Sequence, residues 1–323
     1  MVDEPILRPS RDRFTVFPIE HEDIFKFYKD AIASFWTAEE IQLQQDLIDW
    51  KKLSSDEQHF VKYVLGFFAG SDGVVAENLA VRFYDEVQYA EARQYYATQI
   101  MIEAIHAEVY SLLIDTYVTD PDEKSMLFRA IDTLPTVTEK AQWAIRWIDS
   151  SQSFGERLLA FAVVEGIFFS SSFCAIYWLK ERNLLPGLTF ANELIARDEG
   201  VHTDFAVHIY NNHIMNKIPE SRIIELVRSG VEIEEAFVRQ AVPVRLIGMN
   251  ADLMVQYVQF VADRLVKDLG IPAIYGVDNP FPFMDKISVQ NKSNFFETRV
   301  GAYAKTGSGV SREEMNLSLD ADV

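Results

Sequence analysis

The sequence predicts an all-α protein built as one large helical domain followed by a short tail. Apolar residues recur with helical spacing over long segments, at roughly 56–86, 89–118, 122–150, 155–181, 189–215, 220–242 and 250–268. Stretches rich in Pro, Asp or Gly, such as "TDPDEK" and "LLPGLT", separate these segments, and no alternating strand pattern competes with them. With 323 residues, 49% of them hydrophobic, the chain is long enough to bury a large core.

Local signals predict helix starts and the end of the domain. In "FWTAEEI" Thr37 is a candidate N-cap with Glu40 three residues later, and in "LSSDEQHF" Ser54 and Glu57 repeat this pattern. After about residue 301 the sequence is rich in small and polar residues, "GAYAKTGSGVSREEMNLSLDADV". We therefore expect a helical domain over 1–300 and a flexible C-terminal tail over 301–323.

Composition excludes several classes of protein. The 49 acidic against 30 basic residues give a net charge of −19, which argues against binding to nucleic acid or to anionic membranes. The single cysteine, Cys174, rules out an internal disulfide, and no secretory signal is visible, so we expect a cytoplasmic protein. The longest apolar run, 158–179, is long enough to span a bilayer, but Glu165 lies within it. A carboxylate at mid-membrane costs about 3 kcal/mol, which favours a helix buried in protein.

Two of the predicted helices carry polar side chains on their apolar faces. In "MIEAIHAEVYSLL", Glu103, His106 and Tyr110 fall within about 60° of one another at the helical rotation of about 100° per residue. In "NELIARDEGVHTDFAVH", Glu199 and His202 repeat the Glu-x-x-His spacing on a second helix. Each of these groups is costly to bury without a partner. Something inside the domain must therefore satisfy them.

Two further predicted helices each carry one acid within an apolar stretch, Asp72 in "LGFFAGSDGVVAENLA" and Glu165 in "LAFAVVEGIFFSSSF". Two acid-only helices and two Glu-x-x-His helices together form the ligand pattern of a dinuclear metal site in a ferritin-like helical bundle. Two divalent cations would neutralise the four carboxylates, and one imidazole per metal with oxygen-rich ligation suits iron or manganese. A single Glu-x-x-His pair is more often found at a surface, and a buried acid is usually paired with Arg or a helix end. Recurrence on four helices favours the metal site.

Several stretches resemble a known family. "FWTAEE", "FFAGSDG", "YSLLIDTY", "GLTFANELIARDEG", "LIGMN" and "NFFETRVGAY" resemble the small, radical-generating subunit of class I ribonucleotide reductase of the eukaryotic type, from about residue 4 to the end. The resemblance implies two iron ions per chain, with manganese as the alternative. It also implies a homodimer that docks a large catalytic subunit through the C-terminal tail. The metal ligands that it implies are Asp72, Glu103, His106, Glu165, Glu199 and His202.

The resemblance further implies roles for residues around the metals. Tyr110 matches the tyrosine that carries the radical, and Trp36, His106 and Asp198 match a relay toward Tyr303 in the tail. The apolar pocket around the radical is matched by Phe169, Phe173 and Ile195. The resemblance therefore predicts a subunit that makes a radical and passes it to a partner for the reduction of ribonucleotides.

Two other functions fit the same bundle. A different diiron oxidase or desaturase would use the same ligands, but Tyr110 beside the site and the acidic tail argue against it. A non-catalytic subunit that helps to assemble an active one is the other alternative, and the presence of all six ligand positions argues against that. The tail ends in "NLSLDADV", so Leu317 and Val323 replace the phenylalanines common in animal members, which bears on affinity for the large subunit.

Overall fold

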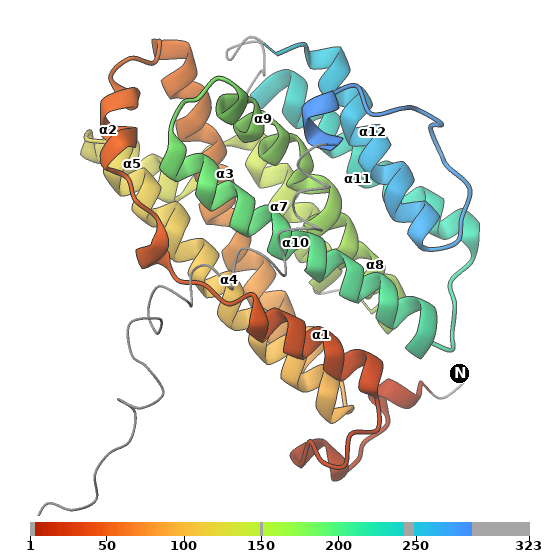
Figure 1. The fold of residues 1–323 in the computed structure, drawn as a ribbon. Coiled ribbons are helices and arrows are strands. Elements are labelled where there is room, and N and C mark those ends of the chain that lie inside the picture. The colour runs from red at the N-terminus through yellow and green to blue at the C-terminus, as the bar shows by residue number, and fades with distance from the viewer. Residues whose placement is uncertain (1–3, 149–150, 242–248, 286–323) are drawn as a thin grey trace, which may run out of the picture. The chain divides into compact units, whose positions relative to one another are not determined.

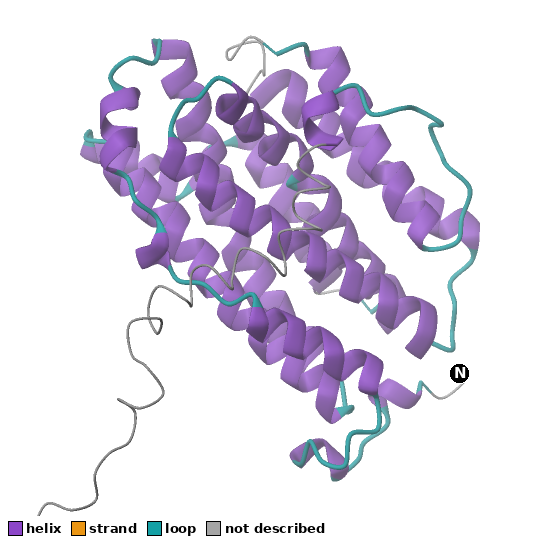
Figure 2. Cartoon of the chain, in the orientation of Figure 1, coloured by secondary structure: helices purple, strands orange, loops and turns teal. Residues whose placement is uncertain are grey.

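The computed structural model describes residues 4–148, 151–241 and 249–285. Within these ranges every regular element is helical, as predicted, and no strand occurs (Figure 2). The helical unit is Met1–Phe281, and of the second unit, Pro282–Val323, only 282–285 are described. The predicted tail, with Tyr303, therefore lies outside the described residues, and its boundary stays a prediction.

Twelve α-helices are described, and three of them run on into short π-helical segments. The α-helices are α1 (Glu22–Ala33), α2 (Gln44–Trp50), α3 (Ser55–Asn78), α4 (Ala90–Tyr117), α5 (Pro121–Phe128), α6 (Ala130–Thr133), α7 (Pro135–Ile148), α8 (Phe154–Val163), α9 (Ser170–Glu181), α10 (Pro186–His213), α11 (Glu220–Ala236) and α12 (Ala251–Asp268). The π segments are η4 (Leu79–Tyr84) after α3, η5 (Val164–Phe168) between α8 and α9, and η6 (Phe237–Ala241) after α11. Single 3-10 turns occur at η1 (Pro5–Leu7), η2 (Asp12–Phe14) and η3 (Ala38–Glu40).

The capping signals have different outcomes at the two predicted sites. Ser54 begins α3 with a complete capping box, in which its hydroxyl accepts from the Glu57 N–H at 3.2 Å and the Glu57 carboxylate accepts from the Ser54 N–H at 2.8 Å. At Thr37 the same pattern begins only the single turn η3, with Glu40 accepting from the Thr37 N–H at 3.2 Å. A capping box thus starts a turn, but apolar packing must extend it into a helix.

The segment predicted as one helix over 122–150 is divided into α5, α6 and α7. Arg129 leaves the helical region with ψ of 30°, and Leu134 is extended with ψ of 107°. Leu134 precedes Pro135, whose ring disfavours the helical conformation of the residue before it. The proline therefore ends α6 and opens α7.

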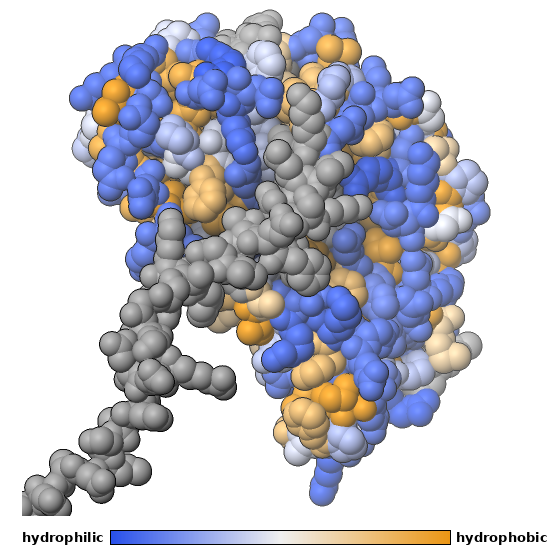
Figure 3. Space-filling model, viewed as in Figure 1, coloured by the Kyte–Doolittle hydropathy of each residue, from blue (hydrophilic) through white to orange (hydrophobic). Residues whose placement is uncertain are grey.

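The long helices pack side by side, and the site residues lie on them. Helix α4 packs against α3 and α1, and α10 packs against α8 and α9 (Figure 1). The run α8–η5–α9 and the run α3–η4 are both long and apolar enough to cross a bilayer by composition. The apolar window of the first run is 94% buried by the protein itself, so it is a core helix, as the sequence predicts. On the face shown in Figure 3, hydrophilic residues predominate, in keeping with the net charge of −19.

Candidate metal centre

The six predicted ligands come from four packed helical segments and meet in the core. Asp72 comes from α3, Glu103 and His106 from α4, and Glu165 from η5. Glu199 and His202 come from α10. All six side chains are buried, with 3% or less of each residue exposed. Charged groups so far from water must be satisfied by one another or by a bound cation.

Two of the glutamates lie between the two imidazoles. One oxygen of Glu103, Oε2, is 3.4 Å from Nδ1 of His106, and the other, Oε1, is 3.0 Å from Nδ1 of His202. Glu199 does the same, with Oε1 3.1 Å from Nδ1 of His106 and Oε2 3.3 Å from Nδ1 of His202. The two ring centres are 6.2 Å apart. Each of these two glutamates thus offers one oxygen to each imidazole, an arrangement in which a carboxylate could bridge two metal ions.

The remaining two acids, Asp72 and Glu165, each lie in one half of the cluster. Potential ligand atoms of Asp72, Glu103 and His106 all lie within 4.8 Å of one another, and so do those of Glu103, Glu165, Glu199 and His202. Glu165 Oε2 is 3.4 Å from Nδ1 of His202. Each half of the cluster therefore has one imidazole and one acid of its own, and Glu103 and Glu199 lie between the halves.

Unsatisfied polar atoms show that this donor set fits metal ions. Among the described residues, several buried atoms of the cluster have no hydrogen-bond partner: Asp72 Oδ2, Glu103 Oε1 and Oε2, His106 Nδ1, Glu165 Oε1 and His202 Nε2. Leaving one buried charge unpaired costs several kcal/mol. Two divalent cations would pair with the carboxylates and Nδ1 atoms at once, with the charge of +4 that four carboxylates need.

The electrostatics of the clustered side chains lead to the same conclusion. Burial, and then the charge of Glu103, raise the pKa of Asp72 well above its usual range. Burial, and then the charge of Glu199, do the same for the pKa of Glu165. Burial acts to lower the pKa of His106, but its hydrogen bond with Asp198 and the nearby charge of Glu103 raise it well above its usual value. Without cations the cluster thus holds protons, which metal binding would displace.

The π segment η5 places Glu165, and side chains satisfy the carbonyls that it frees. A π segment interrupts the regular helical hydrogen bonding. Ser170 Oγ donates to the Ile167 carbonyl at 2.7 Å, and Lys140 Nζ donates to the Phe168 carbonyl at 2.8 Å. Lys140 on α7 therefore supports the segment that carries a candidate metal ligand.

Lys140 belongs to a buried ion pair that our sequence interpretation missed. Its Nζ lies 2.5 Å from Oε2 of Glu234 on α11, and the two side chains are 2% and 0% exposed. The ammonium also lies over the rings of Phe67 and Phe237, 3.9 and 3.5 Å from their centroids. Burial, opposed by the charge of Glu234, lowers the pKa of Lys140 to about 8. Glu234 follows apolar residues at helical spacing, which is the sequence signal that was available.

Tyr110 lies one helical turn beyond His106 on α4, in an apolar environment. The residue is 2% exposed, and its hydroxyl has no hydrogen-bond partner among the described residues. Its ring stacks on Phe68, with centroids 4.5 Å apart, and Phe68 in turn contacts Phe169 and Phe173. Burial, and then the charge of Asp72, raise the pKa of the Tyr110 phenol well above its usual value. The phenol is therefore kept neutral and away from water.

A hydrogen-bonded chain leads from the cluster toward η3. The Trp36 indole N–H donates to Oδ2 of Asp198 at 2.7 Å, and the same oxygen is 3.3 Å from Nε2 of His106. Since Nδ1 of His106 faces the carboxylates, its Nε2–H is the donor to Asp198. Arg197, which the sequence interpretation missed, donates to Oδ1 of Asp198 at 2.8 Å. The structure thus brings together Trp36, Asp198 and His106, while Tyr303 lies outside the described residues.

A helical bundle that buries four carboxylates and two imidazoles in one cluster has the donor set of the carboxylate-bridged dinuclear metal proteins. Comparison with known proteins identifies the family. Residues 13–280 match the family model described as "Ribonucleotide reductase, small chain", and the chain belongs to this family. The ribonucleoside-diphosphate reductase small chain of Trypanosoma brucei brucei is 57% identical over 99% of this chain and 96% of the relative. Subunit M2 of the human enzyme is 54% identical over 99% of this chain and 82% of its own length.

Solved structures agree with the fold. The ribonucleotide reductase Rnr4 homodimer from Saccharomyces cerevisiae superposes with a TM-score of 0.82 at 37% identity, covering 93% of both chains. A dimanganese(II) protein from Streptococcus sanguinis, named NrdF, has a TM-score of 0.75 at 22% identity over 83% of this chain and 96% of its own. The protein is therefore a ribonucleoside-diphosphate reductase small subunit in fold and family, which confirms the resemblance seen in the sequence.

Proposed function

We propose that this small subunit uses a dinuclear iron site and O₂ to form a stable radical on Tyr110, which is passed to the large subunit for reduction of ribonucleotides. The observation that carries the proposal is the position of Tyr110. It lies one turn beyond His106, with a dry hydroxyl that no described residue engages. A phenol beside a metal centre, protected from water, is suited to losing one electron and keeping the radical.

Some residues of the site would bind the metal ions, and others surround the phenol of Tyr110. Asp72, Glu103, His106, Glu165, Glu199 and His202 would hold the ions, and two iron ions with O₂ supply the one-electron oxidant. Tyr110 then loses an electron and the proton of its hydroxyl. Asp72 is the carboxylate whose charge acts most strongly on the phenol. Phe68 covers the ring and excludes water.

The chain from Trp36 to His106 supports transfer of the radical out of the core. Trp36 and His106 stack with ring centroids 6.0 Å apart, and Asp198 hydrogen-bonds to both. A proton on this path can shift across the Asp198 hydrogen bonds as the electron moves. We assign Tyr303 as the next member, in a tail that docks the large subunit. The homodimer of the yeast relative supports a homodimer here as well.

A reconstitution experiment tests the proposal. The metal-free protein is loaded with ferrous iron and exposed to O₂, and the EPR spectrum is recorded. We expect a tyrosyl radical in the natural protein and in Tyr96→Phe, which removes another fully buried, unpartnered hydroxyl from the same helix. We expect none in Tyr110→Phe, although this variant should still bind and oxidise iron. An unchanged radical signal in Tyr110→Phe would move the radical to another tyrosine and overturn the assignment.

A further inference from the structure

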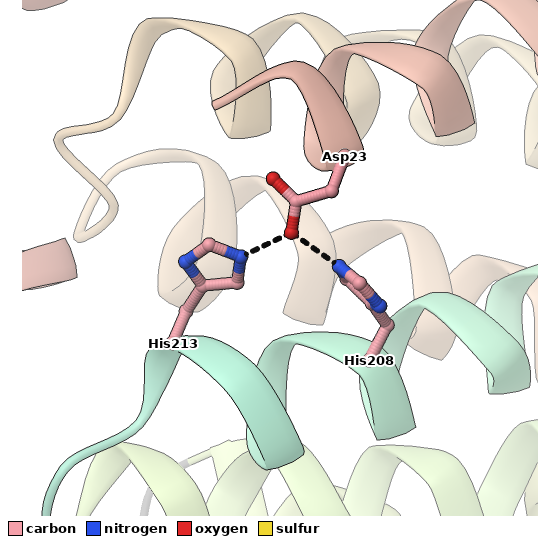
Figure 4. Close-up of side chains that lie close together, drawn as sticks. All are labelled: Asp23, His208 and His213. Atoms are coloured by element: carbon pink, nitrogen blue, oxygen red, sulfur yellow. Dashed lines mark hydrogen bonds and ion pairs between the residues drawn. The ribbon is translucent and has the colours of Figure 1, made fainter. Parts of the chain in front are cut away.

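A second cluster of metal-binding side chains lies at the far end of α10. The carboxylate of Asp23, in the first turn of α1, faces His208 and His213 in the last two turns of α10 (Figure 4). Its Oδ2 atom is 2.7 Å from Nε2 of His208 and 2.7 Å from Nε2 of His213. His208 follows His202 by six residues, about 9 Å along the helix, so this cluster is separate from the buried one.

The two imidazoles are held in place before any ion arrives. The His208 ring packs on Phe27 with centroids 5.1 Å apart, and the His213 ring packs edge-on to His21 at 5.4 Å. His208 and His213 are 24% and 12% exposed, while Asp23 is 43% exposed. The nitrogens are therefore oriented toward one point that water and ions can reach.

The chemistry of the cluster suits a transition metal. Burial acts to raise the pKa of Asp23, but hydrogen bonds from His213 and His208 lower it to about 2, so the carboxylate is ionised near neutral pH. Two imidazole nitrogens and one carboxylate oxygen are a common zinc ligand set, with bonds of about 2.0–2.2 Å and a fourth position left for water. Ligands on one ion stand further apart than 2.7 Å, so Asp23 must move outward slightly. Its exposed position permits that movement.

We propose that Asp23, His208 and His213 form a second metal site, which binds one zinc ion per chain on the surface between α1 and α10. A bound ion would cross-link the two helices. Helix α10 carries Glu199 and His202, and the chain after α1 leads to Trp36. The cross-link would therefore restrict the movement of both segments beside the buried cluster. This proposal does not depend on the radical function assigned to Tyr110.

The test is a zinc titration of the protein whose buried cluster has first been filled with iron. Calorimetry with Zn²⁺ compares the natural protein with Asp23→Asn and with the double variant His208→Asn/His213→Asn. The control is His59→Asn, which alters a histidine packed on Tyr63 in α3, outside the cluster. Iron content and circular dichroism establish that each variant is folded.

We expect the natural protein and His59→Asn to bind one more zinc ion per chain than the double variant. Asp23→Asn should bind that ion at least about tenfold more weakly. Zinc should also raise the Tm of the natural protein and leave that of the double variant unchanged. Equal zinc stoichiometry and affinity in the natural protein and the double variant would overturn the proposal, and so would an absence of zinc binding to the natural protein.

Discussion

Glu103 and Glu199 each turn one oxygen to each imidazole, whereas Asp72 and Glu165 each belong to one half of the cluster. This difference would make the proposed ligands unequal. A ligand in one half would hold one ion, but a ligand between the halves would hold both. The cost of removing a ligand should therefore depend on its place in the cluster and not on its residue type alone.

Substitution of single ligands should reveal this inequality as a count of bound ions. We expect Glu165→Ala and His202→Ala to lose the ion of their own half-site and to retain the one beside Asp72 and His106. Glu103→Ala should lose both ions, because it faces both imidazoles. Elemental analysis of purified, metal-loaded protein measures the count, with Glu108→Ala, an exposed acid on the same helix, as the control. Two tightly bound ions in both Glu165→Ala and His202→Ala would refute the ligand assignment.

Substitution of Trp36 tests the proposed path of radical transfer separately from formation of the radical. Trp36→Phe keeps an aromatic ring but removes the N–H that donates to Asp198 at 2.7 Å. We expect the variant to form the Tyr110 radical normally, since no ligand is changed, and to fall to background in ribonucleotide reduction with the large subunit. Trp50→Phe, on α2 and stacked on Tyr117, should keep both properties. Normal reductase activity in Trp36→Phe would remove the indole N–H from the relay.

At the scale of helical elements, η5 depends on support from neighbouring helices. Lys140 on α7 reaches both the Phe168 carbonyl of η5 and the Glu234 carboxylate of α11. Ser171, in the first turn of α9, donates a hydrogen bond to the same carboxylate. One buried ion pair thus connects three helices to the segment that carries Glu165.

Breaking this pair on one side should be costly. Lys140→Met leaves Glu234 buried without its cation, and we expect a loss of about 3–5 kcal/mol in the free energy of unfolding. Lys140→Met/Glu234→Leu should recover part of that loss, because no unpaired charge remains. Lys124→Met, which breaks an exposed pair with Asp115, should cost less than about 1 kcal/mol. Urea denaturation at fixed metal content measures all three, and equal stability of the Lys140 and Lys124 variants would contradict the expected role.

For the whole molecule, the sequence predicted the helices better than their interruptions. The apolar spacing that places Glu103 and His106 on one face of α4 depends only on helical periodicity, so the buried cluster could be recognised before the fold was known. The π segment η5 could not, because a single extra residue per turn leaves almost no trace in an apolar run such as "AVVEGIFF".

Pairings between distant segments were also invisible in the sequence. Asp46 on α2 accepts the Gly187 and Leu188 N–H groups at the start of α10, at 2.7 and 2.8 Å, yet 141 residues separate Asp46 from Gly187. The pairing of Asp23 with His208 spans 185 residues. Such contacts depend on which helices become neighbours, and spacing along one helix carries no information about that.

Residues 316–323 lie outside the part of the chain that the structure describes, so their sequence is the evidence for their role. The stretch "NLSLDADV" combines Leu317, Leu319 and Val323 with two acids. A few apolar anchors with charge around them are suited to entering a groove on a partner in one orientation. We therefore expect these residues to dock the large subunit.

Deleting 317–323 should leave the radical intact and abolish ribonucleotide reduction. The six ligands and Tyr110 all lie between residues 72 and 202, so EPR of the truncated protein should match that of the full chain. Radical transfer requires the two subunits to be docked, so activity with the large subunit should be lost. A synthetic peptide of residues 316–323 should inhibit the intact pair by competition, and a scrambled peptide should not. Full activity of the truncated protein, measured at subunit concentrations near the binding constant, would show that docking relies on another surface. The concentrations must be this low because an excess of the large subunit can restore the complex even when an anchor is missing.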